Sequence, residues 1–162
     1  GTPVPMDGET QGEIAIRGPN VMKEYLFNPE ATEKTFAGEW LRTGDLGHID
    51  EDGYVFVTGR LKELIIKGGE NIAPREIDEV LYSEPDIIEA AAFARPCKSY
   101  GETVEAAVAI KAGSGLSEES LLALCKDRLG AFKSPDRIHF MDELPKGPSG
   151  KIQRLKLSSF LQ

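Results

Sequence analysis

One lysine of this 162-residue sequence lies in a stretch that favours an exposed loop. Residues 145–154 read PKGPSGKIQR, so Lys151 follows a glycine and has two prolines and two glycines around it. Glycine lets backbone N–H groups approach an anion, and the lysine ammonium adds positive charge, so these residue types could bind a phosphate or a carboxylate. A solvated loop lysine is the other interpretation, because lysine is mostly exposed in proteins.

The stretch does not have the spacing of a nucleotide-binding P-loop, which requires G-x-x-x-x-G-K-[ST]. When that pattern is aligned on Gly150 and Lys151, it requires a glycine at position 145 and a serine or threonine at position 152. The chain has Pro145 and Ile152 there. The spacing therefore excludes a P-loop.

Two further segments contain residue types that suit ligand binding. LRTGDLG, residues 41–47, indicates a glycine turn that presents Asp45. Its carboxylate could accept hydrogen bonds from a vicinal diol such as that of ribose, and an ordinary turn aspartate is the alternative. Further along, a strand-like run ends in Gly68 and Gly69. Two glycines in succession permit the close approach of a ligand, although a plain hairpin turn has the same pattern.

Composition narrows the class of protein. The chain has the length of about one domain, and 40% hydrophobic with 28% charged residues is typical of a globular domain. A net charge of -8 argues against nucleic-acid binding. Residues 146–156 nevertheless hold three lysines, one arginine and no acid, which suits a small anion or simply solvates a terminal helix. No apolar run is long enough for a membrane span, and neither histidine has metal-ligand spacing.

The secondary-structure pattern of the segments that position these residues changes near residue 60. The first part has strand patterns, with a hairpin around residues 50–53 and a helical turn or two after residue 28. The second part is expected to contain, in order, a strand at 64–67, a helix from 74, strands at 87–94 and 103–110, a helix after 117, a strand at 134–140 and a terminal helix. We therefore expect an α+β fold: a β-rich subdomain at 1–61, followed by a small mixed α/β domain at 62–162 with a short sheet and about three helices.

Four segments, in this order, resemble the last third of the acyl-adenylate-forming enzymes, which include acyl-CoA synthetases, peptide-synthetase adenylation domains and firefly luciferase. The segments are GEIAIRGPNVMKEY (12–25), RTGD (42–45), GRLKELIIKGGENIAPREIDEVL (59–81) and LPKGPSGKIQR (144–154). The third segment favours CoA ligases of the oxalate, short or aromatic acid type, because peptide-synthetase domains usually carry aspartate where this chain has Lys62.

The resemblance implies an AMP-forming acid–thiol ligase. A carboxylate would attack the α-phosphate of ATP, held with magnesium, to give acyl-AMP and pyrophosphate, and the CoA thiol would then displace AMP. Lys151 would be the catalytic lysine of the first step, and Asp45 and Arg60 would bind the ribose hydroxyls of the nucleotide.

The resemblance also implies which residues act in domain movement and which lie near CoA. Lys62 matches the hinge about which the small domain swings between the two steps. Gly68, Gly69 and Glu70 match the loop that then lines the pantetheine tunnel. One departure is Cys97, which stands where the family usually has an acidic residue and which we expect to leave the chemistry unaffected.

The partners that the resemblance implies are a small carboxylic acid, ATP with magnesium, and CoA. The family's phosphate loop, adenine segment and acid pocket precede the matched region. The upstream N-terminal domain would therefore supply most of the binding, and residues 1–61 would be its last β subdomain. We expect the chain alone to be inactive and the enzyme to be cytoplasmic, or peroxisomal if a C-terminal signal is missing. Two alternatives are an adenylation domain that loads a carrier protein and a non-catalytic interaction domain that retains the fold.

Overall fold

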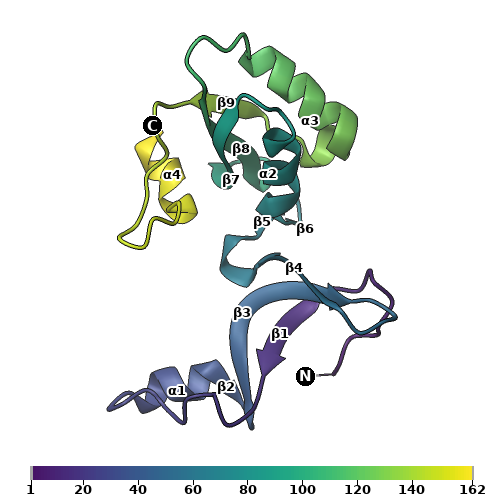
Figure 1. The fold of residues 1–162 in the computed structure, drawn as a ribbon, viewed down its shortest axis with the longest axis vertical. Helices are drawn as coiled ribbons and strands as arrows, with labels where there is room; N and C mark the ends of the chain where they lie inside the picture. Colours follow the sequence, from purple (N-terminus) through teal and green to yellow (C-terminus); the bar gives the residue numbers. More distant parts are fainter. Residues whose placement is uncertain (1, 162) are drawn as a thin grey trace. The chain divides into compact units, whose positions relative to one another are not determined.

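The computed structural model describes residues 2–161, and the chain divides into two compact units, with the division after Lys62. A short 3-10 helix, Leu61–Glu63, spans the division. The first unit contains β1 (Gly12–Ile16), α1 (Pro29–Thr35), β2 (Phe36–Ala37), β3 (Trp40–Ile49) and β4 (Val55–Arg60) (Figure 1). The second contains β5 (Ile65–Lys67), β6 (Glu70–Ile72), α2 (Pro74–Tyr82), β7 (Ile87–Cys97), β8 (Gly101–Ile110), α3 (Glu118–Lys133), β9 (Arg137–Phe140) and α4 (Arg154–Phe160). None of the described helices is both long and apolar enough to cross a membrane.

The first unit is an antiparallel sheet built around β3. This strand pairs with β1 along one edge and with β2 and β4 along the other. The predicted hairpin between β3 and β4 is confirmed. In its turn, Gly53 has a φ of +86° and the Asp50 carboxylate accepts a hydrogen bond from the Tyr54 amide at 2.8 Å.

Few apolar side chains of the first unit are buried. Leu46 is the one large apolar side chain of its described residues that is buried. A sheet of this size needs an apolar face packed against another layer to be stable by itself. The described residues of the first unit therefore do not supply a core of their own.

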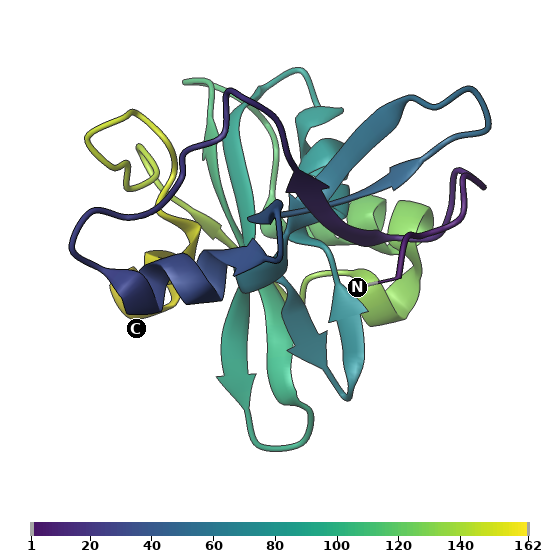
Figure 2. The same cartoon turned by 90° about the horizontal axis from the view of Figure 1, so that it is seen from below.

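The second unit is a sheet with the strand order β6-β5-β8-β7, in which β9 lies beside β8 and parallel to it. Both faces of the β7–β8 hairpin are covered. Ala92 shares a core cluster with Ile77 of α2 and Leu121 of α3 on one face, whereas Phe93 shares a second cluster with Leu157 of α4. Figure 2 shows the hairpin in teal, with α3 in green and the terminal segment in yellow to either side of it. Burial of both faces explains why these strands contain long apolar runs, at residues 90–94 and 106–110, in place of an alternation of apolar and polar residues.

The expected α+β class, with a β-rich first part and a mixed second part that contains three helices, is confirmed. The helix predicted to begin at Pro74 is also confirmed, and so is the helix predicted after residue 117, which begins where the Ser117 hydroxyl accepts a hydrogen bond from the Ser120 amide. The sequence did not predict β6. A three-residue strand that follows two glycines has too few positions to show an alternating pattern.

Candidate functional site

Lys151 lies on an exposed loop between β9 and α4 (Figure 1). The loop closes on itself through an antiparallel bridge between Lys146 and Ile152 and a hydrogen bond from the Gly147 amide to the Lys151 carbonyl at 2.8 Å. Gly150 has a φ of +77°, which glycine adopts without strain. Among the residues that the structure describes, no carboxylate forms an ion pair with the Lys151 ammonium. The loop thus presents an exposed, unneutralised cation.

The N-terminal end of this loop is fixed to β7 by Glu89. One carboxylate oxygen of Glu89 lies 2.5 Å from the Lys146 ammonium, and the other accepts a hydrogen bond from the Leu144 amide at 3.0 Å. Lys146 also pairs with Glu143 at 2.8 Å. The hydrogen bond from Lys146 lowers the pKa of Glu89, and the bonds to Glu143 and Glu89 raise the pKa of Lys146. Both groups are therefore charged across the neutral range.

The C-terminal end is fixed by Arg154, the first residue of α4. Its guanidinium binds both carboxylate oxygens of Asp78, at 2.6 and 3.2 Å, and lies 3.0 Å from the Glu63 carboxylate. It also donates to the Ala92 carbonyl of β7, while the Ala92 amide donates to Asp78 at 2.7 Å. Burial raises the pKa of Asp78, and Arg154 opposes that shift. One side chain thus joins four segments of the second unit.

These contacts change the interpretation of the basic stretch at residues 146–156. Lys146 and Arg154 are neutralised by carboxylates, so the four cations do not form one anion-binding cluster. Of the four, only Lys151 and Lys156 have no ion-pair partner among the described residues. The sequence suggested neither Lys146 nor Arg154 as a structural residue, because the carboxylates that tie them to other elements, Glu89, Asp78 and Glu63, are distant in the chain.

The structure brings Asp45 and Arg60 together. They are opposite each other in the β3–β4 pair, and the Arg60 Nε lies 3.0 Å from the Asp45 Oδ1. The side chain of Asp45 is 31% exposed and that of Arg60 is 57% exposed, so a ligand could reach both. A carboxylate with spare acceptor positions beside a guanidinium offers both halves of a hydrogen-bonding site for hydroxyl groups.

The predicted glycine turn at Asp45 is wrong. Asp45 lies inside β3, where three residues, from Thr43 to Asp45, are opposite the single residue Ile14 of β1. This is a β-bulge, and Gly44 allows it with a φ of +76°. The Thr43 hydroxyl donates to the Ile14 carbonyl at 2.8 Å and accepts from the Asp45 amide at 3.0 Å. Turns and bulges both use a glycine with positive φ, so the sequence pattern did not separate them.

Gly68 and Gly69 form the two-residue turn of the β5–β6 hairpin. Their φ values are +58° and +90°, and the flanking residues Lys67 and Glu70 pair with each other. Two positive φ values are what a tight hairpin turn of this length requires. The Gly68 amide donates to the Tyr100 carbonyl at 2.9 Å, which fixes the turn to the start of β8. The hairpin interpretation thus accounts for both glycines.

Replacing Gly68 with alanine is expected to destabilise the second unit by about 1–2 kcal/mol, the cost of a left-handed backbone angle in a residue with a Cβ. The new Cβ would also lie 3.3 Å from the Tyr100 ring. Urea unfolding measures the change. The matched control is Gly115→Ala, because Gly115 has no positive φ and no atom near its Cβ position. Equal stabilities for the two variants would contradict the assignment.

A buried lysine, Lys67 of β5, stabilises this hairpin. The ammonium of Lys67 donates to the Phe132 carbonyl at 3.0 Å and lies 3.7 Å from the Asp136 carboxylate. Its side chain is almost fully buried. The sequence gave no signal for this role, because a lysine next to a turn is normally exposed.

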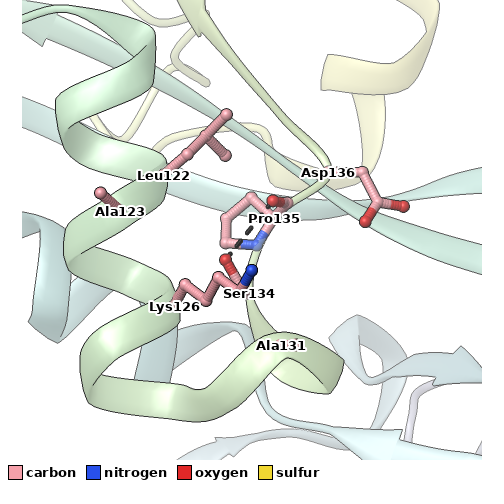
Figure 3. Close-up of a pocket in the computed structure, with 7 residues that line it drawn as sticks. All are labelled: Leu122, Ala123, Lys126, Ala131, Ser134, Pro135 and Asp136. Carbon is pink, nitrogen blue, oxygen red and sulfur yellow. Dashed lines mark hydrogen bonds between the residues drawn. The ribbon is translucent and has the colours of Figure 1, made fainter.

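The pocket drawn in Figure 3 contains none of the predicted site residues. It lies between α3 and the segment that precedes β9, and its volume is about 260 Å³. Its lining consists of Leu122, Ala123, Lys126, Ala131, Ser134, Pro135 and Asp136. We therefore place the candidate site on the Lys151 loop and the Asp45–Arg60 pair, each within its own unit.

Lys62 is exposed and is the last residue of the first unit. The next residue, Glu63, is bound to Arg154 and so belongs structurally to the second unit. The change from one compact unit to the other therefore falls at Lys62.

Comparison with known proteins defines the class. Residues 76–151 match the family described as the AMP-binding enzyme C-terminal domain. The matched residues all lie in the second unit, so this unit contains an AMP-binding enzyme C-terminal domain.

Particular relatives extend the similarity to nearly the whole chain. A sulfoacetate–CoA ligase from Cupriavidus necator is 50% identical over 158 residues, which are 97% of this chain and 31% of that protein. An amide bond synthetase from Marinactinospora thermotolerans has a TM-score of 0.92 at 36% identity, covering 100% of this chain and 33% of its own. The o-succinylbenzoate CoA synthetase of Bacillus subtilis in complex with ATP and magnesium has a TM-score of 0.82 at 38% identity, covering 91% and 30%. The chain spans about a third of the length of these proteins.

Proposed function

We propose that the chain is the C-terminal part of an ATP-dependent acyl-CoA synthetase, which activates a carboxylic acid as acyl-AMP and transfers the acyl group to CoA. The observation that carries the proposal is the Lys151 loop, which has two fixed ends and an unneutralised ammonium between them. The 50% identity to a CoA ligase supports the same conclusion.

In this proposal Lys151 acts in the first step. A carboxylate and a triphosphate are both anions, so their approach concentrates negative charge at the reacting atoms. An ammonium aimed at that charge stabilises the transition state more than the separated reactants. Lys146 and Arg154 cannot replace it, since their own carboxylate partners hold them.

Asp45 and Arg60 would bind the nucleotide through its ribose. The Asp45 carboxylate would accept hydrogen bonds from the two ribose hydroxyls, and Arg60 would donate to a hydroxyl oxygen while it orients the Asp45 carboxylate. Magnesium would be held with ATP, mainly by upstream residues. CoA would approach the turn formed by Gly68, Gly69 and Glu70.

An upstream domain of the same protein completes the enzyme in this proposal. The first unit exposes large apolar side chains, among them Met22, Leu26, Phe27, Trp40, Tyr54 and Phe56. The relatives are about three times as long as this chain. We infer that upstream residues pack against these apolar side chains, that residues 1–61 are the last β subdomain of the large domain, and that residues 62–162 are the mobile domain. The enzyme would act in the cytoplasm.

The acceptor is tested with the full-length enzyme. Acid-dependent exchange of pyrophosphate into ATP reports the first step. CoA, an amine and a carrier protein are then compared as acceptors of the acyl group. We expect exchange with a carboxylic acid and acyl transfer to CoA. Absence of exchange with every acid tried would contradict adenylation, and transfer to the amine or the carrier protein alone would contradict the assignment of CoA.

Replacing Lys62 with proline is expected to leave adenylation near the wild-type rate and to slow thioester formation on the order of tenfold or more. Proline fixes φ and restricts the backbone at the point where the two units are joined, so it would hinder a swing between the two steps. The two half-reactions are measured separately, with Lys62→Ala as the control that removes the side chain but leaves the backbone free. An unchanged rate of thioester formation would refute the hinge.

A further inference from the structure

We propose that Lys146 and Arg154 are positioning residues that fix the two ends of the Lys151 loop to β7, so that the lysine is held in place for acyl-adenylate formation. The inference rests on the proposed function, and it concerns residues that contact neither acid nor nucleotide. Each acts through Lys151.

The first anchor combines charge and backbone contacts. Glu89 of β7 accepts from the Lys146 ammonium at 2.5 Å and from the Leu144 amide at 3.0 Å. Its side chain is only 15% exposed, so water does not compete freely for these bonds. Because one carboxylate binds two adjacent points of the chain, it fixes the direction in which the loop leaves the sheet.

The second anchor is more deeply buried. The guanidinium of Arg154 is 16% exposed and its partner Asp78 is 11% exposed, and the two form a bidentate pair. The Ala92 carbonyl of β7 accepts a further hydrogen bond from the same guanidinium. A planar, bidentate contact fixes orientation as well as distance. The start of α4 is therefore fixed in direction too.

Among the described residues, the backbone hydrogen bonds of residues 147–152 stay within the loop, and the partly buried Ile152 packs against the core cluster that contains Phe93 and Leu157. The Gln153 amide donates to the Pro145 carbonyl at 2.8 Å, and the Gly150 amide donates to the Gly147 carbonyl at 2.9 Å. In the part of the chain that the structure describes, no residue between Gly147 and Lys151 forms a hydrogen bond or ion pair with another element. Glu89 and Ala92, which lie three positions apart on β7, are thus the polar attachment points of the loop, beside the apolar contact of Ile152.

Both anchors also neutralise cations that would compete with Lys151 for an anion. With Lys146 and Arg154 paired, an approaching carboxylate or phosphate meets one unneutralised ammonium in the loop. A displacement of about 1 Å at a reacting group can cost up to about 10²-fold in rate. Loss of one anchor should therefore slow the lysine-dependent step and spare the other.

The test uses the full-length enzyme and the Lys146→Met variant, which keeps a long side chain but no charge. We expect adenylation to fall on the order of tenfold, with thioester formation from supplied acyl-AMP within about twofold of wild type. Lys146→Arg should restore most of the adenylation rate, and Glu89→Gln should reproduce the loss. The matched control is Lys156→Met, which removes a nearby lysine that has no ion pair among the described residues.

A double-variant experiment separates positioning from an independent role. In a Lys151→Ala background, Lys146→Met should cause no further loss of adenylation, because a positioning residue has nothing left to position. Hydrogen exchange supplies a readout other than activity. The Gly147 and Gln153 amides should exchange on the order of tenfold faster in Lys146→Met, while the amides of α3 stay unchanged.

Three outcomes would overturn the inference: wild-type adenylation in Lys146→Met, an equal loss in both half-reactions, or an additive loss in the Lys151→Ala background. Failure of the proposed function looks different. If Lys151→Ala itself retains adenylation, Lys151 is not the catalytic lysine. The positioning role of Lys146 and Arg154 is then wrong as well. If Lys151→Ala abolishes adenylation and Lys146→Met matches wild type, only the positioning role is wrong.

Discussion

Lys151→Ala in the full-length enzyme is expected to slow acyl-adenylate formation by about 10²–10³-fold, the usual cost of removing one charge partner of a transition state. Thioester formation from supplied acyl-AMP should continue near the wild-type rate, because the step in which the carboxylate and the triphosphate meet is already complete in that intermediate. Pyrophosphate exchange measures the first step, and release of AMP from acyl-AMP and CoA measures the second.

The control for this variant is Lys156→Ala, which removes a second exposed lysine from the same end of the chain. Lys156 lies on α4, beyond the second anchor, and should not affect either step. If Lys151→Ala reduces both half-reactions to the same extent, the lysine supports folding or general substrate binding, and its assigned role is incorrect. Lys151→Arg should recover only part of the rate, since a guanidinium is planar and places its charge differently.

Arg154→Ala is expected to lower the free energy of unfolding of the second unit by about 3–5 kcal/mol, the range for breaking a buried ion pair by removal of one partner. The Asp78 carboxylate would remain buried without its guanidinium, and the Ala92 carbonyl would lose a donor. Urea unfolding followed by circular dichroism measures the difference. Arg128→Ala on the exposed surface of α3 is the control, with an expected change within about 0.5 kcal/mol.

The same variant should respond to pH in a defined direction. Burial raises the pKa of Asp78, and Arg154 opposes that shift in the intact chain. In Arg154→Ala the opposition is gone, so the pKa of folded Asp78 rises further above its unfolded value. Protonation then favours the folded state, and the penalty grows as pH rises through the folded pKa. The variant should recover part of its lost stability on acidification from pH 7, and a constant difference from wild type down to pH 5 would argue against a buried unpaired carboxylate.

Local signals predicted much of the fold. The hairpin between β3 and β4, the proline at the start of α2 and the serine cap of α3 each depend on residues within one turn of the chain. The continuous apolar sequences of β7 and β8 predicted core strands for the same reason. A strand buried on both faces needs no distant partner to be detected.

The sequence was less informative where a residue's role depends on distant partners. The order of four segments indicated Lys151, Asp45 and Arg60. The partners of Arg154, however, are 76 and 91 positions away in the chain, and Lys146 pairs with a carboxylate 57 positions away. No spacing rule connects such residues. From the sequence, the basic side chains of residues 146–156 could be unpaired positive charges. In the fold, Lys146 and Arg154 instead form ion pairs that connect the loop to other elements.

The contact between Arg154 and Glu63 has a mechanical consequence. Glu63 begins the second unit and Arg154 begins its final helix, so a single side chain connects the first residue of this unit to its last helix. This contact restricts the backbone that follows Lys62. A rotation of the second unit about Lys62 would therefore move the Lys151 loop together with the rest of that unit. The distance that the Lys151 ammonium moves would then depend mainly on the dimensions of the second unit, and only a little on the flexibility of the glycines in the loop.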